Sequence, residues 1–529
     1  MIDAVGLLCY NDIIDIWKGR MKGMEREDMK KILEIGVMLS SERDLNRLLE
    51  QILSCVMELA HCDGGTLYLL DGDKLHFKIM RNDTLKTYDG GDGQDPKLPP
   101  VPLARGNVCA LALLENRTIC IDDVRNCREY DLSGPIRYDE MTGYRTKSML
   151  VVPMHNRKGE EIGVLQLINA LDGEGNVCAF GQDMALVLES IASQAAITIQ
   201  NVRYMEEIKG LFRSFVMVMS SAIDKRTPYN GSHTRHMAEY GSRFIDYLNC
   251  LAQKDGRREP FSPIHKDEFL MSVWLHDIGK LVTPLEVMNK VARLLPAQQA
   301  EFTHRMEVIR LQAEIAGLKG EITKEERERQ IRRAYEVEKL VGQVNGTGFI
   351  TDEKLEELRR LGEETYVGEK GERCPWLLPE EMELLCIRKG TLSEQEREIM
   401  EEHVVVTDKL LSQIHFSAEL SHVREWAAAH HEMLNGSGYP EGKMAEEIPQ
   451  EVRILTILDI FDALVADDRP YKPGMPVEKA LSILKTMAEK EGKLDRELTA
   501  LFAESRCWED QKDLQEGSRQ EQLKAAEVH

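Results

Sequence analysis

The chain has 529 residues, which is too long for one ordinary domain and suits two to four. Hydrophobic residues make up 42% of it, charged residues 30%, and the formal net charge is −23. This balance is typical of a soluble globular protein and disfavours a DNA-binding protein, which would be basic. No apolar run reaches membrane-spanning length, and the start lacks the basic residues of a signal peptide, so we expect a cytoplasmic protein without a membrane partner.

The first part of the chain predicts a compact α+β domain. After an N-terminal helical segment over residues 1–23, apolar residues recur at helical spacing from Glu27 to Ala60. Segments of alternating apolar and polar residues follow, separated by turn signals such as Asp71-Gly72. A helical pattern without proline then runs from Asp183 to Lys225. Helix, several strands and helix define a domain that we place at residues 24–203.

Two segments of this domain resemble the sheets of GAF domains in cyclic-nucleotide phosphodiesterases: TGYRTKSMLVVPM (142–154) and GVLQLINA (163–170). The resemblance covers most of residues 24–203. It implies a sensor domain with a small-molecule ligand that the sequence does not identify. A ligandless scaffold for dimerisation carries equal weight.

The signature of the cyclic-nucleotide-binding GAF domains is incomplete in this chain. Asn169 and Phe180 fit it, but Ala170 replaces its lysine and Asp183 lies one place early. We therefore expect the domain to bind cyclic AMP or cyclic GMP poorly.

The helix from Asp183 to Lys225 keeps a broad apolar stripe over its whole length. One small domain can bury only its first half, and folding back on that domain is the alternative for this half alone. A parallel coiled coil between two chains would bury the rest. The stripe therefore predicts a homodimer, with residues 204–220 as a linker helix.

A segment at residues 294–388 differs in composition from its surroundings, since it is rich in Glu, Arg, Lys and Gln. Gly317 and Gly320 interrupt its helical pattern, and Thr323 is a plausible N-cap where the pattern restarts. We expect a helical hairpin inserted into the domain that surrounds it. His304 in this hairpin is expected to be solvated.

Two apolar helices outside the insertion contain carboxylates. We expect a short helix in DEFLMSVWLHDIGK that ends at Gly279 with His276 and Asp277 in its last turn, and the helix in RILTILDIFDALVADDRPYK contains Asp459 and Asp462. The second helix is apolar on nearly all sides, which predicts burial. A buried carboxylate needs hydrogen-bond donors or a cation, and two in one helix favour a cation.

Further histidines lie in similar settings. His403 follows a capping box and shares a helix face with leucines, so we expect it to point inward, where a core histidine is the alternative. His233 opens another helix. His430 and His431 precede the loop NGSGYP, a pattern that favours metal ligands beside a loop that a substrate approaches closely.

Together these segments resemble the HD-GYP family, the bacterial cyclic di-GMP phosphodiesterases of the HD superfamily. The motifs SHT, HDIGK, EEHVVVT, HHEMLNGSGYP, LDIFDAL and DRPYK recur in family order. The resemblance implies an all-α domain over residues 221–505, interrupted by the insertion and followed by a polar tail (506–529). The residues that it implies as metal ligands are His233, His276, Asp277, His403, His430, His431 and Asp459. Those that it implies at the substrate are Lys280, Gly436, Gly438, Tyr439, Pro440, Arg469 and Lys472, with Asp277 and Lys280 as the catalytic pair.

This set of residues suits two divalent ions that share Asp277 and activate water for in-line attack on phosphorus. Mixed imidazole and carboxylate ligands suit Fe or Mn. Lys280 would stabilise charge in the transition state and Arg469 would hold a non-reacting phosphate, with surface solvation as the alternative for both. Glu432 would orient a histidine or lie on a helix surface.

Three departures from the family pattern matter. Asn435 stands where family members often have Asp, and VADDRPYK is one residue longer than the usual spacing, which leaves the reach of Arg469 open. Tyr229 stands where some trinuclear members have Glu. We therefore expect two ions rather than three.

The leading hypothesis is a GAF-regulated phosphodiesterase that hydrolyses cyclic di-GMP to linear pGpG, with further hydrolysis to GMP left open. A catalytically silent cyclic-dinucleotide receptor is an alternative, which the complete ligand set disfavours. An HD phosphohydrolase acting on another nucleotide is a second alternative, which the GSGYP loop disfavours.

Overall fold

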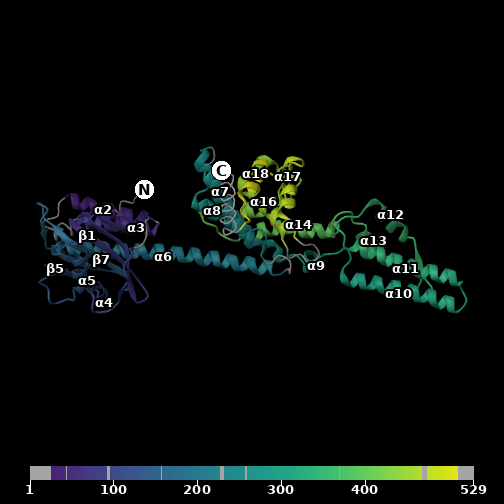
Figure 1. The fold of residues 1–529 in the computed structure, drawn as a ribbon, viewed down its shortest axis with the longest axis horizontal. Coiled ribbons are helices and arrows are strands. Elements are labelled where there is room, and N and C mark those ends of the chain that lie inside the picture. Colours follow the sequence, from purple (N-terminus) through teal and green to yellow (C-terminus); the bar gives the residue numbers. More distant parts are fainter. Residues whose placement is uncertain are drawn as a thin grey trace, which may run out of the picture. The chain divides into compact units, whose positions relative to one another are not determined.

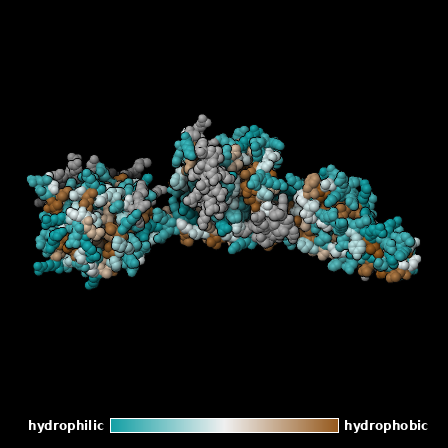
Figure 2. All heavy atoms as spheres, in the orientation of Figure 1, coloured by the Kyte–Doolittle hydropathy of each residue, from teal (hydrophilic) through white to brown (hydrophobic). Residues whose placement is uncertain are grey.

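The computed structural model describes residues 26–42, 44–91, 96–156, 158–226, 232–256, 259–368, 370–466 and 474–509. The chain divides into two compact units, Met1–Leu211 and Phe212–His529 (Figure 1). The N-terminal segment predicted for residues 1–23 and most of the polar tail lie outside the described residues. Among the helices described, none is long and apolar enough to cross a membrane. Hydrophilic residues cover most of the surface that is visible in Figure 2.

One antiparallel sheet forms the centre of the first unit. Its strand order is β3-β2-β1-β7-β6-β5, with β4 beside β2 and β8 beside β7. The strands are β1 (Cys62–Asp71), β2 (Lys74–Asn82), β3 (Thr87–Gly90), β4 (Val101–Pro102), β5 (Ile119–Ile121), β6 (Met149–His155), β7 (Glu161–Leu171) and β8 (Val177–Cys178).

The sheet divides its apolar side chains between two cores, because successive residues of a strand point to opposite faces. In β1, Leu67 and Leu69 pack with helices α2 (Arg26–Ser41) and α3 (Leu45–Leu59), whereas Tyr68 packs on the side of α4 (Val108–Leu114) and α5 (Ser133–Thr142). The predicted α+β arrangement is confirmed. The helical stretch from Glu27 to Ala60 is two helices, because the Asp44 carboxylate accepts from the Arg47 amide and starts α3 anew.

Helix α6 (Gln182–Asp224) runs from the first unit into the second, and its bounds match the prediction to within one residue. Leu188, Ala195 and Ile199 in its first half are fully buried in the core of the first unit. Val216, nearer its end, joins a cluster in the second unit. One helix is therefore part of both units.

The second unit is helical outside the insertion. Its helices are α7 (His233–Asp255), α8 (Pro263–Leu275), η1 (Ile278–Leu281), α9 (Leu285–Met288), α14 (Glu394–Leu411), η2 (Ala418–Leu420), α15 (Val423–Ala428), η3 (Ala445–Glu447), α16 (Gln450–Val465), α17 (Val477–Glu489) and α18 (Arg496–Ser505). α16 is its central helix, with Ile454, Leu458 and Phe461 fully buried among side chains of α7, α8, α17 and α18. α8 ends at Leu275, so His276 caps it and Asp277 precedes η1; the prediction of one helix continuing to Gly279 is wrong in this detail.

The insertion is more than the predicted hairpin. α10 (Pro296–Leu318) and α11 (Lys324–Asn345) form that hairpin, with Thr323 capping α11 as predicted. They are followed by α12 (Asp352–Leu361), a two-stranded β9 (Thr365–Val367) and β10 (Arg373–Pro375) sheet, and α13 (Pro379–Leu385). These helices lie together in Figure 1, and the elements share a core of their own around Phe302, Val341 and Leu358. His304 is exposed, as predicted.

Candidate metal centre

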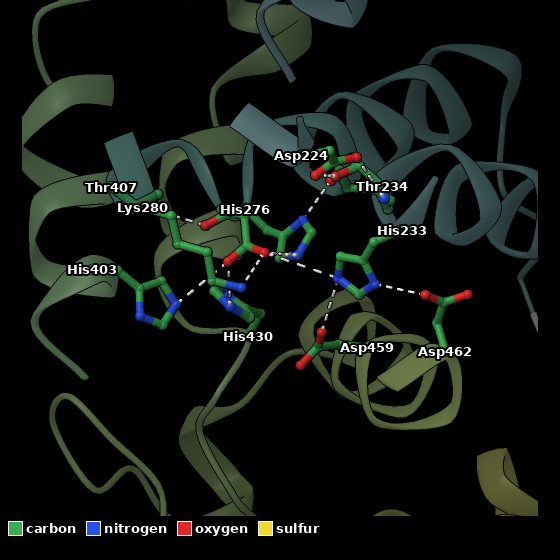
Figure 3. Close-up of polar contacts among 12 residues, drawn as sticks. Asp224, His233, Thr234, His276, Lys280, His403, Thr407, His430, Asp459 and Asp462 are labelled. Atoms are coloured by element: carbon green, nitrogen blue, oxygen red, sulfur yellow. Dashed lines mark hydrogen bonds and ion pairs between the residues drawn. The ribbon is translucent and has the colours of Figure 1, made fainter. Parts of the chain in front are cut away.

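Three histidines of the second unit are held by the same local bond. The Nδ1 atoms of His276, His403 and His430 lie 2.7, 2.6 and 2.7 Å from the carbonyl oxygen three residues earlier. A carbonyl oxygen only accepts hydrogen bonds, so each Nδ1 carries a proton, and in the neutral imidazole each Nε2 then carries the lone pair. Local helical geometry thus fixes the tautomer and turns all three Nε2 atoms to one place (Figure 3).

These Nε2 atoms are buried without a hydrogen-bond partner, and so is Oδ1 of Asp277. Leaving such acceptors unsatisfied costs about 1–3 kcal/mol for each group. Lone pairs that converge in a buried place suit a cation, because a cation satisfies several acceptors at once. The residues present therefore fit a metal centre.

The Asp277 carboxylate lies between two groups of ligands. Its Oδ2 is 3.2 Å from His276 Nε2 and 3.9 Å from His233 Nε2, whereas its Oδ1 is 3.5 Å from His403 Nε2 and 3.8 Å from His430 Nε2. Two sets of donor atoms lie close enough to hold an ion each: His233, His276 and Asp277, and His403, His430 and His431. Asp277 therefore faces both sets with different oxygens.

Asp459 also faces both sets. Its Oδ1 is 3.3 Å from His233 Nε2, and its Oδ2 is 3.7 Å from His431 Nδ1. Asp462, one helical turn later in α16, accepts from His233 Nδ1 at 2.6 Å. Asp462 thus supports the predicted ligand His233. Asp462 itself was not among the predicted site residues, although its position in a buried helix indicated that it needs a partner.

Burial and neighbouring groups shift the pKa values of the site residues. Burial would raise the pKa of Asp277, but the neighbouring His276 imidazole and the Lys280 ammonium lower it well below its usual value. Burial also lowers the pKa of His403 and His430, and that of His431 to about 4. These three imidazoles are therefore neutral at pH 7, which metal binding requires.

His233 has the opposite shift. Burial would lower its pKa, but hydrogen bonds with Asp459 and Asp462 raise it to about 10. Asp277 adds a third negative charge nearby. This end of the site attracts positive charge, whether a proton on His233 or a cation.

Close packing against α14 fixes the turn that carries His276 and Asp277. The Thr407 hydroxyl donates to the His276 carbonyl and accepts from the Gly279 amide, both at 3.0 Å. A Cβ on Gly279 would lie 1.8 Å from the His403 carbonyl oxygen. Only glycine allows this approach, which brings His403 to Asp277.

The loop after His431 packs on the histidine turn itself. A Cβ on Gly438 would lie 2.5 Å from the His431 carbonyl oxygen, so this glycine serves internal packing. Glu432 is buried and accepts from the amides of Glu441 and Lys443, both at 2.8 Å. Both interpretations of Glu432 were therefore wrong, because its carboxylate fastens the loop rather than orienting a histidine or facing solvent.

The remaining predicted substrate residues differ in placement. The Tyr439 ring lies 4.7 Å from the His431 ring, centroid to centroid, and burial raises its pKa well above the usual value. Lys280 Nζ lies 2.6 Å from Asp277 Oδ2. Gly436 takes a positive φ in the same loop, and Pro440 is exposed. Arg469 and Lys472 lie outside the described residues.

Comparison with protein families gives two matches. A GAF domain model matches residues 42–200, and an HD domain model matches residues 376–498. The HD match covers His403, His430, His431 and Asp459, and it begins after His276. A crystal structure of the GAF domain from an Acinetobacter phosphoenolpyruvate-protein phosphotransferase is similar over 35% of this chain and 99% of that chain, with 16% identity and a TM-score of 0.26.

Curated relatives match parts of the chain. The 3'3'-cGAMP-specific phosphodiesterase 3 of Vibrio cholerae is 41% identical over 18% of this chain and 20% of its own length. The cyclic di-GMP phosphodiesterase response regulator RpfG of Xanthomonas campestris is 28% identical over 39% of this chain and 55% of its own length. A cyclic di-GMP phosphodiesterase of Thermotoga maritima is 37% identical over 20% of this chain and 28% of its own length. The chain thus spans about half, or less, of the length of these relatives.

Fold, site and comparisons define a GAF domain followed by an HD domain. Within the second of these domains the chain is similar to curated phosphodiesterases of cyclic dinucleotides.

Proposed function

We propose that the second unit is a metal-dependent phosphodiesterase that hydrolyses cyclic di-GMP to linear pGpG under the control of the GAF domain. The observation that carries this proposal is the set of buried, unpartnered imidazole nitrogens that face Asp277 beside the HHEMLNGSGYP turn. The curated relatives support it, because their names describe phosphodiesterases of cyclic dinucleotides.

The proposed centre holds two divalent ions, Fe or Mn. His403, His430 and His431 would hold one, and His233 and His276 the other, with Asp277 and Asp459 facing both. Such ions, when bound, polarise a phosphoryl group and lower the pKa of water. Tyr229, at the position where a third ion would need a carboxylate ligand, lies outside the described residues, so the count of two ions stays a prediction.

The side chains of the chain itself orient the phosphodiester. Asp277 fixes the Lys280 ammonium at 2.6 Å, and the ammonium can donate its remaining protons to a phosphoryl oxygen. The Tyr439 ring beside His431 provides an apolar wall with a hydroxyl that stays protonated at neutral pH. These groups would hold the phosphorus near the centre and stabilise charge on its oxygens.

The test is incubation of the full chain with Mn or Fe(II) and a cyclic dinucleotide, followed by chromatography. We expect cyclic di-GMP to be converted to pGpG. 3'3'-cGAMP is the second candidate substrate, because the relative with 41% identity is named for it. Comparing kcat/KM for the two decides between them, and binding without turnover of either would support the silent receptor instead.

Lys280→Ala should keep the metal and slow catalysis. No predicted ligand is removed, but the donor next to Asp277 is lost. Charge-stabilising donors contribute about 2.7–4 kcal/mol, so we expect kcat to fall roughly 10²–10³-fold. Elemental analysis and steady-state kinetics on the same sample measure both effects, and an unchanged kcat would contradict the role given to Lys280.

The protein should be a parallel homodimer through α6. Ile208, Leu211, Phe215 and Val218 are 60–72% exposed and follow the 3-4-3 spacing of a coiled-coil seam. Leu211→Glu should give monomers in light scattering at micromolar concentration. Met217→Glu, an exposed apolar residue outside this seam, is the matched control and should stay dimeric. A monomeric wild-type chain would contradict the proposal.

The GAF domain should not bind cyclic AMP or cyclic GMP tightly. Asn169 is buried and its amide is used internally, accepting from the Lys147 amide at 2.7 Å and donating to Tyr144 and Arg145. A cavity of about 780 Å³, lined by Tyr68 and Gln166 among others, leaves room for another small molecule. Calorimetry with both cyclic mononucleotides measures this, and micromolar binding of either would contradict it.

A further inference from the structure

The C-terminal end of α6 contacts the segment that carries His233. Asp224 is the last residue of α6, and its carboxylate accepts from the Thr234 amide at 3.2 Å and the Thr234 hydroxyl at 3.0 Å. Thr234 directly follows His233, the first residue of α7. Ser232 at the N-cap makes no capping bond, so Asp224 supplies the acceptor that the first turn of α7 needs.

Arg226, two residues beyond the end of α6, contacts the segment that carries His276 and Asp277. Its guanidinium donates to the carbonyl oxygens of Lys280 at 2.6 Å, Leu281, and Thr283 at 3.3 Å. The last carbonyls of a helix lack partners within it, and the fork of a guanidinium can bind several of them. Lys280 and Leu281 are the last two residues of η1, which directly follows Asp277.

We propose that Asp224 and Arg226 are positioning residues through which α6 sets the place of His233 relative to the turn of His276 and Asp277. The proposal rests on the proposed function of the metal centre. Two contacts lie within three residues at one helix end, so a rotation or shift of α6 moves both ligand-bearing segments.

The two contacts predict different kinetic defects. Arg226→Ala should lower kcat at least about 10-fold, because small displacements of catalytic groups cost up to 10²-fold. KM and manganese content should stay within about twofold, since no ligand is removed. Arg226→Lys should recover part of kcat, because an ammonium still donates to carbonyls. Asp224→Ala should instead weaken manganese binding through His233, and Asp224→Asn, which keeps an acceptor oxygen, should weaken it less.

Arg213→Ala is the matched control. Arg213 is an exposed arginine of the same helix and pairs with Asp267 near the start of α8, at the opposite end of that helix from His276. It should leave kcat and manganese binding unchanged. An equal loss of kcat in this variant would overturn the proposal, because the loss of any contact of α6 would then lower kcat.

Hydrogen exchange of backbone amides measures the Arg226 contact independently of catalytic activity. The amides of Lys280, Val282 and Thr283 bond within this turn. Their exchange should rise at least about 10-fold in Arg226→Ala and not in Arg213→Ala. If the wild-type chain hydrolysed no cyclic dinucleotide, the proposed function would fail while this measurement still decided the contact.

Three results would overturn the inference: wild-type kcat in Arg226→Ala, unchanged exchange in residues 280–283, or loss of helical content by circular dichroism in the Arg226 and Asp224 variants. The last would make these residues requirements of folding rather than of positioning.

Discussion

Replacing Asp277 by alanine will remove bound metal from both halves of the centre and abolish hydrolysis. Oδ1 of Asp277 faces His403 and His430, and Oδ2 faces His276 and Lys280, so no other side chain described contacts as much of the centre. Its loss also leaves the Lys280 ammonium without its counter-charge. We expect kcat/KM to fall at least about 10³-fold, as for groups that act together as a unit.

Elemental analysis of the purified variant, together with chromatography of the dinucleotide products, measures this result. Asp408→Ala is the control, since Asp408 lies on α14 in the same unit and pairs at the surface with Arg424 at 2.7 Å. Exposed ion pairs contribute about 0–1 kcal/mol, so this variant should keep its metal and its activity. Two ions per chain retained in Asp277→Ala would show that the carboxylate is not shared.

Gly279→Ala should be nearly as damaging, although it adds only one methyl group. The new Cβ would lie 1.8 Å from the His403 carbonyl oxygen and 2.7 Å from the Thr407 amide nitrogen. α14 and the turn of His276 must then separate, which moves His403 away from Asp277. Overpacking of this kind costs about 1–3 kcal/mol of stability. We also expect the protein to lose the ion that His403, His430 and His431 would hold.

Urea unfolding and manganese titration measure the two effects. Gly342→Ala is the matched substitution, because Gly342 lies within α11 with nothing within 4 Å of its added Cβ. It should stabilise the protein by roughly 0.5–1 kcal/mol, since alanine loses less entropy than glycine in a helix. Wild-type manganese affinity in Gly279→Ala would mean that α14 and the turn can separate without moving His403.

The sequence by itself determined the elements and the kinds of residue at the site. Periodicity of 3.6 and 2 residues predicted α6 and the sheet of the first unit, because one buried face imposes these spacings. The apolar surroundings of Asp459 and Asp462 predicted a buried helix, and Ile457 and Phe461 are indeed fully buried. Local chemistry of this sort depends on neighbours in the chain, so it can be inferred without a fold.

Only the tertiary structure decided which residues meet. The sequence gives no sign that Asp462 supports His233, 229 positions earlier, or that Thr407 ties α14 to the His276 carbonyl. It suggested that the glycines of the NGSGYP loop admit a substrate, whereas Gly438 is needed by the chain's own backbone. Likewise, the charged surface of α10 and α11 predicted a solvated hairpin, but further elements add a core to it. Each of these contacts joins distant segments, and their partners are fixed by packing in three dimensions rather than by spacing along the chain.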